Sequence, residues 1–321
     1  MKILLTGTSG QLGRSLAKAL QDVGEIITPQ RAELDLSDIA SIAPYIQQCK
    51  PDLIINPAAY TAVDLAEKES ELAFRVNAEA PAILAQEAKN LGIGLIHFST
   101  DYVFDGSKSI AVGERASYSE SDTCAPLNVY GASKLAGEQA IVKSGCAHLI
   151  FRTSWVYSDF GKNFLLTILR LAKEKTELNI VNDQWGTPSS TLFLSETVKQ
   201  VILQLKNDVT HAKTHAETTA AWWQQHQGIY HLTPNGYTNW CEFSQRIVAH
   251  AAQFGLLSFP LPKIQGIPSS AYPTPAQRPK NSCLDKRKFS QEFGIPLPDW
   301  DLALQSCLQS MASEKLQSTA N

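Results

Sequence analysis

The sequence contains few cysteines, and their positions argue against the two structures that most often depend on them. The six cysteines among 321 residues lie far apart and form no C-x-x-C pair. A disulfide framework or a structural zinc site requires closer spacing, so neither is expected. The seven histidines are equally scattered. We therefore predict reduced thiols, a cytoplasmic location and no metal site.

An excess of one charge and a long apolar run are also missing. The 28 basic and 31 acidic residues leave a net charge of −3. Such a chain has no overall field that would attract nucleic acid or an anionic membrane. No apolar run approaches the ~18 residues of a membrane-crossing helix. The N-terminal residues run directly into a strand pattern and lack the cleavage site of a signal peptide. Neither nucleic acid nor a membrane is therefore expected as a partner.

A glycine-rich turn near the N-terminus is the first feature that indicates a ligand. Residues 2–5 have a strand pattern, Gly7, Gly10 and Gly13 follow, and residues 14–20 have a helical pattern. Glycines allow a tight turn and a close approach of the backbone to a pyrophosphate, and the N–H groups at the helix start face its charge. An ordinary βα turn would have the same order of elements, but the context favours dinucleotide binding.

The end of the second strand, residues 25–28, bears on the choice between NADH and NADPH. An acid at this place favours NAD, whereas an arginine accommodates the additional phosphate of NADP. The strand is followed by Arg31, and the first acids are Glu33 and Asp35. The pattern therefore favours NADPH, with Arg31 as a cofactor contact. Asp35 and Leu36 are expected near the adenine, although Asp35 could instead cap the helix that follows.

Two later apolar runs, residues 52–56 and 94–98, are typical of parallel strands buried on both faces. Ligands bind at the carboxyl ends of such strands. The first run is followed by Ala58 and Ala59, whose small side chains would let a cofactor lie against the backbone. The second leads to Thr100, whose hydroxyl can hydrogen-bond a substrate carbonyl. His97, inside the second run, is expected to pack in the core.

Tyr130 and Lys134 form the candidate catalytic pair. They lie four residues apart at the start of a helical pattern, so both side chains project from one face of the helix. An ammonium beside a phenol favours the phenolate and lowers its pKa, which makes the tyrosine a possible proton donor. The pair alone is a weak signal, because chance supplies such a spacing often.

The order of the patterns predicts an α/β fold with a Rossmann-type doubly wound parallel sheet, since strands and helices alternate through residue 153. We assign residues 1–155 to an NAD(P)-binding Rossmann domain, with returns to the sheet near 178–206 and 229–232. Residues 156–321 are mainly a smaller, irregular substrate-binding region, because the last 60 residues are rich in proline. The roles of the long segments 105–127 and 207–228 stay open.

Four motifs in this order resemble the extended short-chain dehydrogenase/reductases: Gly7-x-x-Gly10-x-x-Gly13, Asn56-Pro57-Ala58-Ala59, Ser99-Thr100-Asp101-Tyr102-Val103-Phe104 and Tyr130-x-x-x-Lys134. Five further segments are similar to the dTDP-4-dehydrorhamnose reductase family: residues 61–64, 126–131, 151–157, 181–184 and 271–279. The second similarity extends through both halves of the chain, so it bears on the substrate as well as on the fold.

The resemblance implies NAD(P)H-dependent reduction of the 4-keto group of dTDP-4-dehydro-L-rhamnose, the last step of dTDP-L-rhamnose synthesis. It implies that Tyr130 donates the proton, that Lys134 binds the nicotinamide ribose and tunes Tyr130, and that Thr100 completes the catalytic set. The substrate contacts that it implies are Thr100, Asp101 and Trp155. The cofactor contacts that it implies are Gly10, Gln11, Leu12, Asp35, Leu36, Ala59, Tyr60 and Thr61.

The resemblance leaves several points open. Some family members dimerise through a magnesium ion held by acidic residues, and Ser15 and Leu192 stand at the apparently matching positions, so a monomer and a homodimer are both possible. Another nucleotide-sugar reductase or epimerase would share the main motifs. A regulatory subunit like that of methionine adenosyltransferase keeps the fold without catalysis, but Thr100, Tyr130 and Lys134 are all present here and favour an enzyme.

Overall fold

The centre of the protein is a parallel six-stranded sheet. The computed structural model describes residues 1–111, 114–210 and 215–320. The strand order is β12-β7-β4-β3-β1-β2, and every neighbouring pair runs parallel. The strands are β1 (Lys2–Leu5), β2 (Glu25–Ile27), β3 (Leu53–Asn56), β4 (Gly94–Thr100), β7 (Ala147–Thr153) and β12 (Gly228–His231). The predicted Rossmann-type doubly wound sheet is confirmed.

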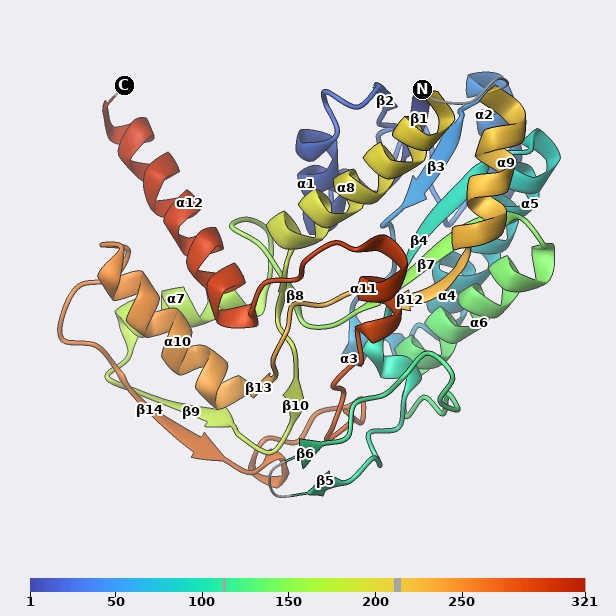
Figure 1. The fold of residues 1–321 in the computed structure, drawn as a ribbon. Helices are drawn as coiled ribbons and strands as arrows, with labels where there is room; N and C mark the ends of the chain where they lie inside the picture. The colour runs from blue at the N-terminus through green and yellow to red at the C-terminus, as the bar shows by residue number, and fades with distance from the viewer. Residues whose placement is uncertain (112–113, 211–214, 321) are drawn as a thin grey trace.

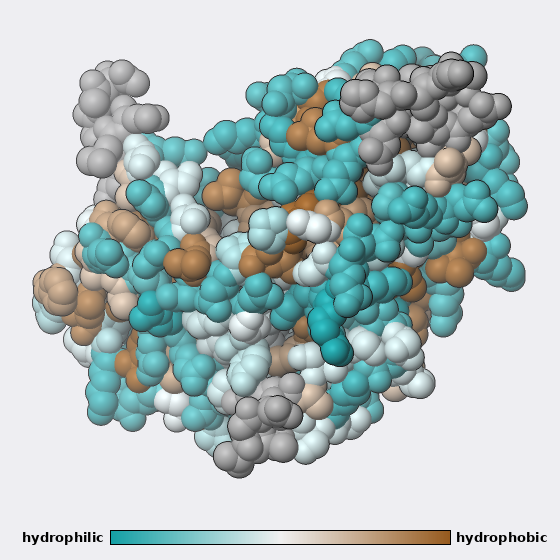
Figure 2. Space-filling model, viewed as in Figure 1, coloured by the Kyte–Doolittle hydropathy of each residue, from teal (hydrophilic) through white to brown (hydrophobic). Residues whose placement is uncertain are grey.

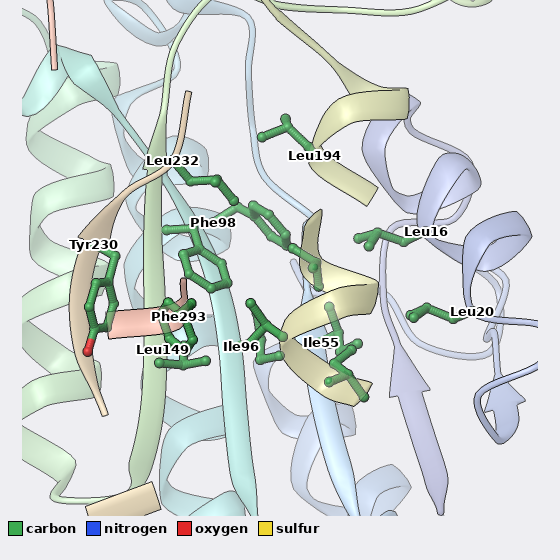
Figure 3. Packing of buried hydrophobic residues seen from close by; sticks show 14 of the residues in the cluster. Leu16, Leu20, Ile55, Ile96, Phe98, Leu149, Leu194, Tyr230, Leu232 and Phe293 are labelled. Atoms are coloured by element: carbon green, nitrogen blue, oxygen red, sulfur yellow. The ribbon is translucent and has the colours of Figure 1, made fainter. Parts of the chain in front are cut away.

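Helices cover both faces of this sheet because its strands are apolar on both faces. Along β1, Ile3 and Leu5 belong to one buried cluster and Leu4 to the other, as the two-residue period of a strand requires. The first cluster includes residues from α1 (Gln11–Ala19), α8 (Thr191–Thr210), α9 (His215–His226) and α11 (Arg287–Phe293), and Figure 3 shows its packing. The second includes residues from α2 (Ile39–Cys49), α5 (Ala80–Leu91) and α6 (Val129–Ser144).

The helical stretch from residue 70 to 91 is interrupted. It consists of α4 (Ser70–Phe74), a π-helical turn (Arg75–Glu79) and α5. Insertions of this kind occur frequently at functional sites. The turn carries the buried Asn77, which hydrogen-bonds Ser133 of α6. Ser133 directly precedes Lys134 of the predicted catalytic pair.

A second core lies beside the sheet. It is formed mainly by α7 (Phe164–Glu174), α10 (Trp240–Gln253) and α12 (Trp300–Ala320), together with the parallel strands β9 (Glu177–Val181) and β14 (Lys263–Ile267). We call these five elements the cap, and Figure 1 shows them on one side of the molecule with the sheet on the other. Further two-stranded sheets join β8 (Val156–Tyr157) to β11 (Ser189–Ser190) and β10 (Trp185–Gly186) to β13 (Thr238–Asn239).

The predicted returns to the sheet take different forms. Residues 228–231 form its edge strand β12. The stretch 178–206 adds no strand to it, because β9 pairs with β14, and it is α8 that packs against α1. The end of the chain also differs from the sequence pattern. It is one long helix, α12, within the region that was expected to be irregular.

The two long segments are now partly explained. Segment 105–127 contains the short antiparallel strands β5 (Ile110–Ala111) and β6 (Glu114–Arg115), with residues 112–113 outside the described part. Segment 207–228 contains the end of α8 and all of α9, and residues 211–214 between them are likewise outside it. Trp222 and Trp223 of α9 are buried against the sheet, so this segment completes the core.

Hydrophilic residues predominate on the face in Figure 2, and hydrophobic residues form scattered patches there. Within the residues that the structure describes, no helix is both long enough and apolar enough to cross a membrane.

Candidate active site

A cavity of about 690 Å³ lies at the carboxyl ends of β1, β3, β4 and β7. It is lined by every residue that the sequence assigned to cofactor, substrate or catalysis. These residues are Gly7, Gly10, Gln11, Leu12, Gly13, Arg31, Asp35, Leu36, Ala58, Ala59, Tyr60, Thr61, Thr100, Asp101, Tyr130, Lys134 and Trp155. The cavity also includes residues that the sequence did not single out, among them Lys162 and Trp240.

The glycine-rich turn forms a floor that requires glycine at two of its positions. Gly7 has a φ of 62°, and a Cβ on Gly7 would lie 2.8 Å from the Cα of Ala58, which is a collision. A Cβ on Gly13 would lie 2.1 Å from the carbonyl oxygen of Gly7. Helix α1 begins directly after Gly10, which makes no side-chain cap, so its first N–H groups remain available to a phosphate. The turn therefore fits a dinucleotide pyrophosphate.

The opposite end of the cofactor region holds an exposed arginine and a fixed carboxylate. Asp35 accepts hydrogen bonds from the backbone N–H of Ser37 at 2.9 Å and from Arg31 Nε at 3.0 Å. The Ser37 bonds, more than Arg31, lower the pKa of Asp35. Arg31 is largely exposed, so its guanidinium is accessible to a second anion.

Helix α6 presents Tyr130 and Lys134 to the cavity. Asn128 caps the helix by accepting a hydrogen bond from the N–H of Gly131 at 2.8 Å. A Cβ on Gly131 would lie 2.2 Å from the carbonyl oxygen of Tyr102, so this glycine lets the helix approach the chain just after β4. The cap and the glycine together fix the position of Tyr130 relative to the end of β4.

The pKa of Tyr130 differs from the sequence-based expectation. Burial raises the pKa of Tyr130, a hydrogen bond with Thr100 lowers it, and the charge of Asp101 raises it. The result of all three is a pKa of about 12. The predicted lowering by Lys134 is not met. The reason lies in the contacts of Lys134, whose Nζ donates to the carbonyl oxygen of Phe98 at 2.7 Å and lies 3.2 Å from His97 Nε2.

Lys134 is itself perturbed. It is only 2% exposed, and burial lowers its pKa to about 8 although the charge of Glu138 raises it. His97 is completely buried, and its pKa lies well below the usual value because of burial and of Lys134. The prediction that His97 packs in the core is confirmed, and its ring in addition contacts the candidate catalytic lysine.

Thr100 and Asp101 follow β4 and carry a further polar group into the cavity. Thr100 Oγ1 donates to Asp101 Oδ1 at 3.0 Å. Burial raises the pKa of Asp101 to about 6, while hydrogen bonds from Ser282 and Thr100 lower it. Ser99 Oγ and Thr153 Oγ1 also line the cavity and have no hydrogen-bond partner in the described part of the protein. Buried hydroxyls of this kind are available to a polar ligand.

An aromatic pair lines the side of the cavity nearest the cap. Trp155 has a φ of 48°, which is uncommon for a non-glycine residue. Its ring stacks on that of Trp240 with centroids 3.6 Å apart and an angle of 8°. A Cβ on Gly186 would lie 2.7 Å from the Trp155 indole, so the ring has a glycine behind it. No periodicity around residue 240 could have shown this pairing, which depends on where α10 packs.

Asn77 joins the cofactor loop to the catalytic helix. Its Oδ1 accepts from the N–H of Tyr60 at 2.8 Å, and its Nδ2 donates to the Tyr60 carbonyl and to Ser133 Oγ, each at 3.0 Å. Helix α6 can approach this turn because a Cβ on Gly137 would lie 2.1 Å from the carbonyl oxygen of Asn77. The π-helical turn thus fixes the loop that carries Tyr60 relative to helix α6.

The positions that correspond to the magnesium ligands of some relatives do not fit a metal here. Ser15 Oγ lies 2.9 Å from Ser195 Oγ and donates to the carbonyl oxygen of Thr191 at 3.1 Å. Leu192 is aliphatic, and magnesium is usually bound through carboxylates. Among residues 1–111, 114–210 and 215–320, no three His, Cys, Asp or Glu side chains gather into a potential metal site.

Comparison with known proteins bears on the family. The model of the RmlD substrate binding domain matches residues 1–313. The dTDP-4-dehydrorhamnose reductase of Burkholderia thailandensis is 42% identical over 315 residues, which is 98% of this chain and 100% of that protein. The enzyme of the same name from Escherichia coli K12 is 39% identical over 315 residues, 97% of this chain and 98% of that protein.

Solved structures lead to the same family as the sequence comparisons. The crystal structure of dTDP-4-dehydrorhamnose reductase from Bacillus anthracis in complex with NADP has a TM-score of 0.82 and 30% identity, covering 96% of this chain and 99% of that one. UDP-glucose 4-epimerase of Thermus thermophilus in complex with NAD has a TM-score of 0.71 at 17% identity, covering 97% and 99%, which reflects the fold alone. The family resemblance predicted from the motifs is confirmed, and the chain belongs to the RmlD substrate binding domain family.

Proposed function

We propose that this protein reduces the 4-keto group of dTDP-4-dehydro-L-rhamnose with NADPH or NADH and so forms dTDP-L-rhamnose. The observation that carries the proposal is the single cavity in which the glycine-rich turn, the Tyr130 and Lys134 pair, and Thr100 meet. The similarity to the named reductases supports the substrate, because it extends through the cap and the C-terminal segments. Fold alone would not decide the substrate.

Each residue has a distinct part in the proposed reaction. When bound, the nicotinamide supplies a hydride to the carbonyl carbon. Tyr130 gives its phenolic proton to the developing alkoxide oxygen, and a donor that is already in place stabilises charge that appears only in the transition state. The raised pKa of Tyr130 keeps the phenol protonated at neutral pH, as a proton donor requires. Thr100 positions the carbonyl oxygen, and Asp101 and Trp155 hold the sugar.

We propose that residues 1–155 carry mainly the cofactor and that residues 156–321 carry mainly the sugar nucleotide. Gly7, Gly10 and Gly13 would hold the pyrophosphate, and the turn leaves no room for a side chain at Gly7 and Gly13. Lys134 would contact the nicotinamide ribose. Arg31 favours NADPH, since its exposed guanidinium can pair with the additional phosphate.

We place the reaction in the cytoplasm and leave both a monomer and a homodimer open. None of the six cysteines, all of which lie in the described part of the chain, forms a disulfide, which is usual for a reducing compartment. The proposed chemistry assigns no part to magnesium, because Ser15 and Leu192 are unsuited to bind it.

The direct test is an assay of the purified protein with dTDP-4-dehydro-L-rhamnose and either NADPH or NADH. Nicotinamide absorbance should fall with both the sugar and the protein present, and dTDP-L-rhamnose should form. Turnover of a different nucleotide sugar alone would favour another reductase or epimerase of the same fold. NADPH binding without turnover of any dTDP-sugar would favour a regulatory subunit.

A further inference from the structure

A buried chain of polar side chains connects the glycine-rich turn to Lys134. Thr6 Oγ1 donates to Asn56 Oδ1 at 2.6 Å, and Asn56 Nδ2 lies 3.1 Å from His97 Nδ1. His97 Nε2 lies 3.2 Å from Lys134 Nζ. The four residues are at most 2% exposed. Since buried polar groups must be satisfied by their neighbours, the direction of each hydrogen bond constrains the next one.

In the arrangement observed, each hydrogen bond of this series of buried side chains is donated in the direction of Lys134. The amide nitrogen of Asn56 faces Nδ1, so Nδ1 accepts and the proton of the neutral imidazole lies on Nε2. That N–H faces Nζ, which can accept it only as a neutral amine while donating to the Phe98 carbonyl. This direction of the chain therefore matches the amine form of Lys134.

The ammonium form requires the opposite direction. An ammonium has no lone pair, so Nε2 must accept and the ring proton must lie on Nδ1. Asn56 then has to present its carbonyl oxygen to Nδ1, which a half-turn of the amide provides. The amide nitrogen would donate to the Thr6 hydroxyl, which can either donate or accept. One proton enters at Nζ, and the imidazole stays neutral throughout.

We propose that His97 is a positioning residue whose tautomer changes with the protonation state of Lys134 and couples Lys134 to Asn56. The inference rests on the proposed catalytic role of Lys134. The titratable and charged groups around Lys134 are His97 on β4, Tyr130 and Glu138 on its own helix, and Arg152 on β7, which pairs with Glu138 at 2.6 Å. Among these, His97 contacts Nζ directly, and its neutral ring adds a fixed hydrogen bond without a competing charge.

Nitrogen-15 NMR of histidine-labelled protein tests this without any turnover, so its result is independent of the substrate assay. The His97 signals are assigned by their loss in His97→Gln. We expect the ring proton to move from Nδ1 to Nε2 as the pH rises, with a midpoint near the Lys134 pKa of about 8 and no charged imidazolium. One tautomer across the whole range, or a ring that becomes charged, would overturn the proposal.

Two variants show whether the change passes through this chain. In Lys134→Met the pH-dependent change should disappear, whereas Lys89→Met, which removes a lysine hydrogen-bonded to the Ser144 carbonyl, should keep it. In Asn56→Asp the side chain can only accept, so the proton should stay on Nδ1 at every pH. A change that persists in Lys134→Met or Asn56→Asp contradicts the proposal, and thermal melts establish that each variant is folded.

Discussion

The sheet and the cap meet at one cavity, but different physical rules build them. Strand β4 in the sheet is buried at all seven of its positions, whereas β9 in the cap has one buried residue among five. A strand buried on both faces is mostly apolar, and this makes it visible in a sequence. The cap strands β9 and β14 are held by each other and by the helices around them. Their sequences consequently carry little signal.

This difference corresponds to the proposed division of labour. The sheet presents backbone and short side chains at its strand ends, which suits a cofactor of constant shape. The cap contributes the aromatic Trp240 from the start of α10, and the loop before α7 contributes the charged Lys162. Changes in the sheet should therefore alter chemistry and cofactor binding, and changes in the cap should alter binding of the sugar.

The largest expected effect is at the sheet side. Tyr130→Phe should lower kcat by about 10²–10⁴-fold, the usual contribution of general acid catalysis. The affinity for NADPH should stay the same, because the ring remains in place. Steady-state kinetics and NADPH fluorescence titration measure the two quantities. An unchanged kcat would remove Tyr130 from the catalytic set.

Cofactor selectivity gives the next largest effect. Arg31→Gln should raise the Kd of NADPH by roughly tenfold, since one charge-assisted contact at an exposed site is worth about 1.4 kcal/mol. The Kd of NADH should change little. Lys18→Gln is the matched control, because Lys18 is equally exposed and its ion pair with Glu314 lies outside the cavity. Equal losses for both cofactors would assign Arg31 to another part of the dinucleotide.

The aromatic pair tests the cap side. Trp240→Ala should raise KM for the sugar nucleotide by roughly 2–10-fold, because a stacked pair contributes about 0.5–1.5 kcal/mol. Trp240→Phe should lose less. NADPH affinity measured on the same samples should be unaffected. A loss of cofactor affinity as large as the change in KM would contradict the assignment of sugar binding to the cap and cofactor binding to the sheet.

The smallest effect concerns the junction of the two regions. Arg278 pairs with Asp64 of α3 (Val63–Ala66) at 2.7 Å, and this hydrogen bond lowers the pKa of Asp64. A carboxyl with a lowered folded pKa stabilises the fold above its unfolded pKa of about 3.9, and the contribution is lost as the pH falls through the folded value.

Arg278→Gln should therefore cost about 0.5 kcal/mol at neutral pH, a small figure because Asp64 is 41% exposed. The difference from the wild type should vanish in acid. Urea denaturation from neutral pH downward measures both effects. Arg246→Gln is the control, since its pair with Asp301 lies within the cap. A destabilisation by Arg278→Gln that grows as the pH falls would contradict the proposed stabilisation of the fold by ionised Asp64.

Much of the site was predictable because its residues follow strands that are visible as apolar runs. Gly7, Ala58 and Thr100 each come two residues after the end of such a run, and parallel strands place their carboxyl ends at one edge. Trp240 could not be found in this way, because it reaches the cavity from a cap helix. The contact of His97 with Lys134 could not be predicted, because a buried histidine in a strand looks the same in a sequence whether or not a lysine lies beside it.

The sequence by itself determined the parallel sheet, the phosphate turn and the spacing of Tyr130 and Lys134, because these depend on residues that are close along the chain. Only the tertiary structure decided the state of that pair. Thr6 follows β1, Asn56 lies on β3 and His97 on β4, and their connection to Lys134 exists only once the sheet is assembled and α6 is packed on it. Burial then sets the pKa of both catalytic candidates, and burial is a property of the folded chain as a whole.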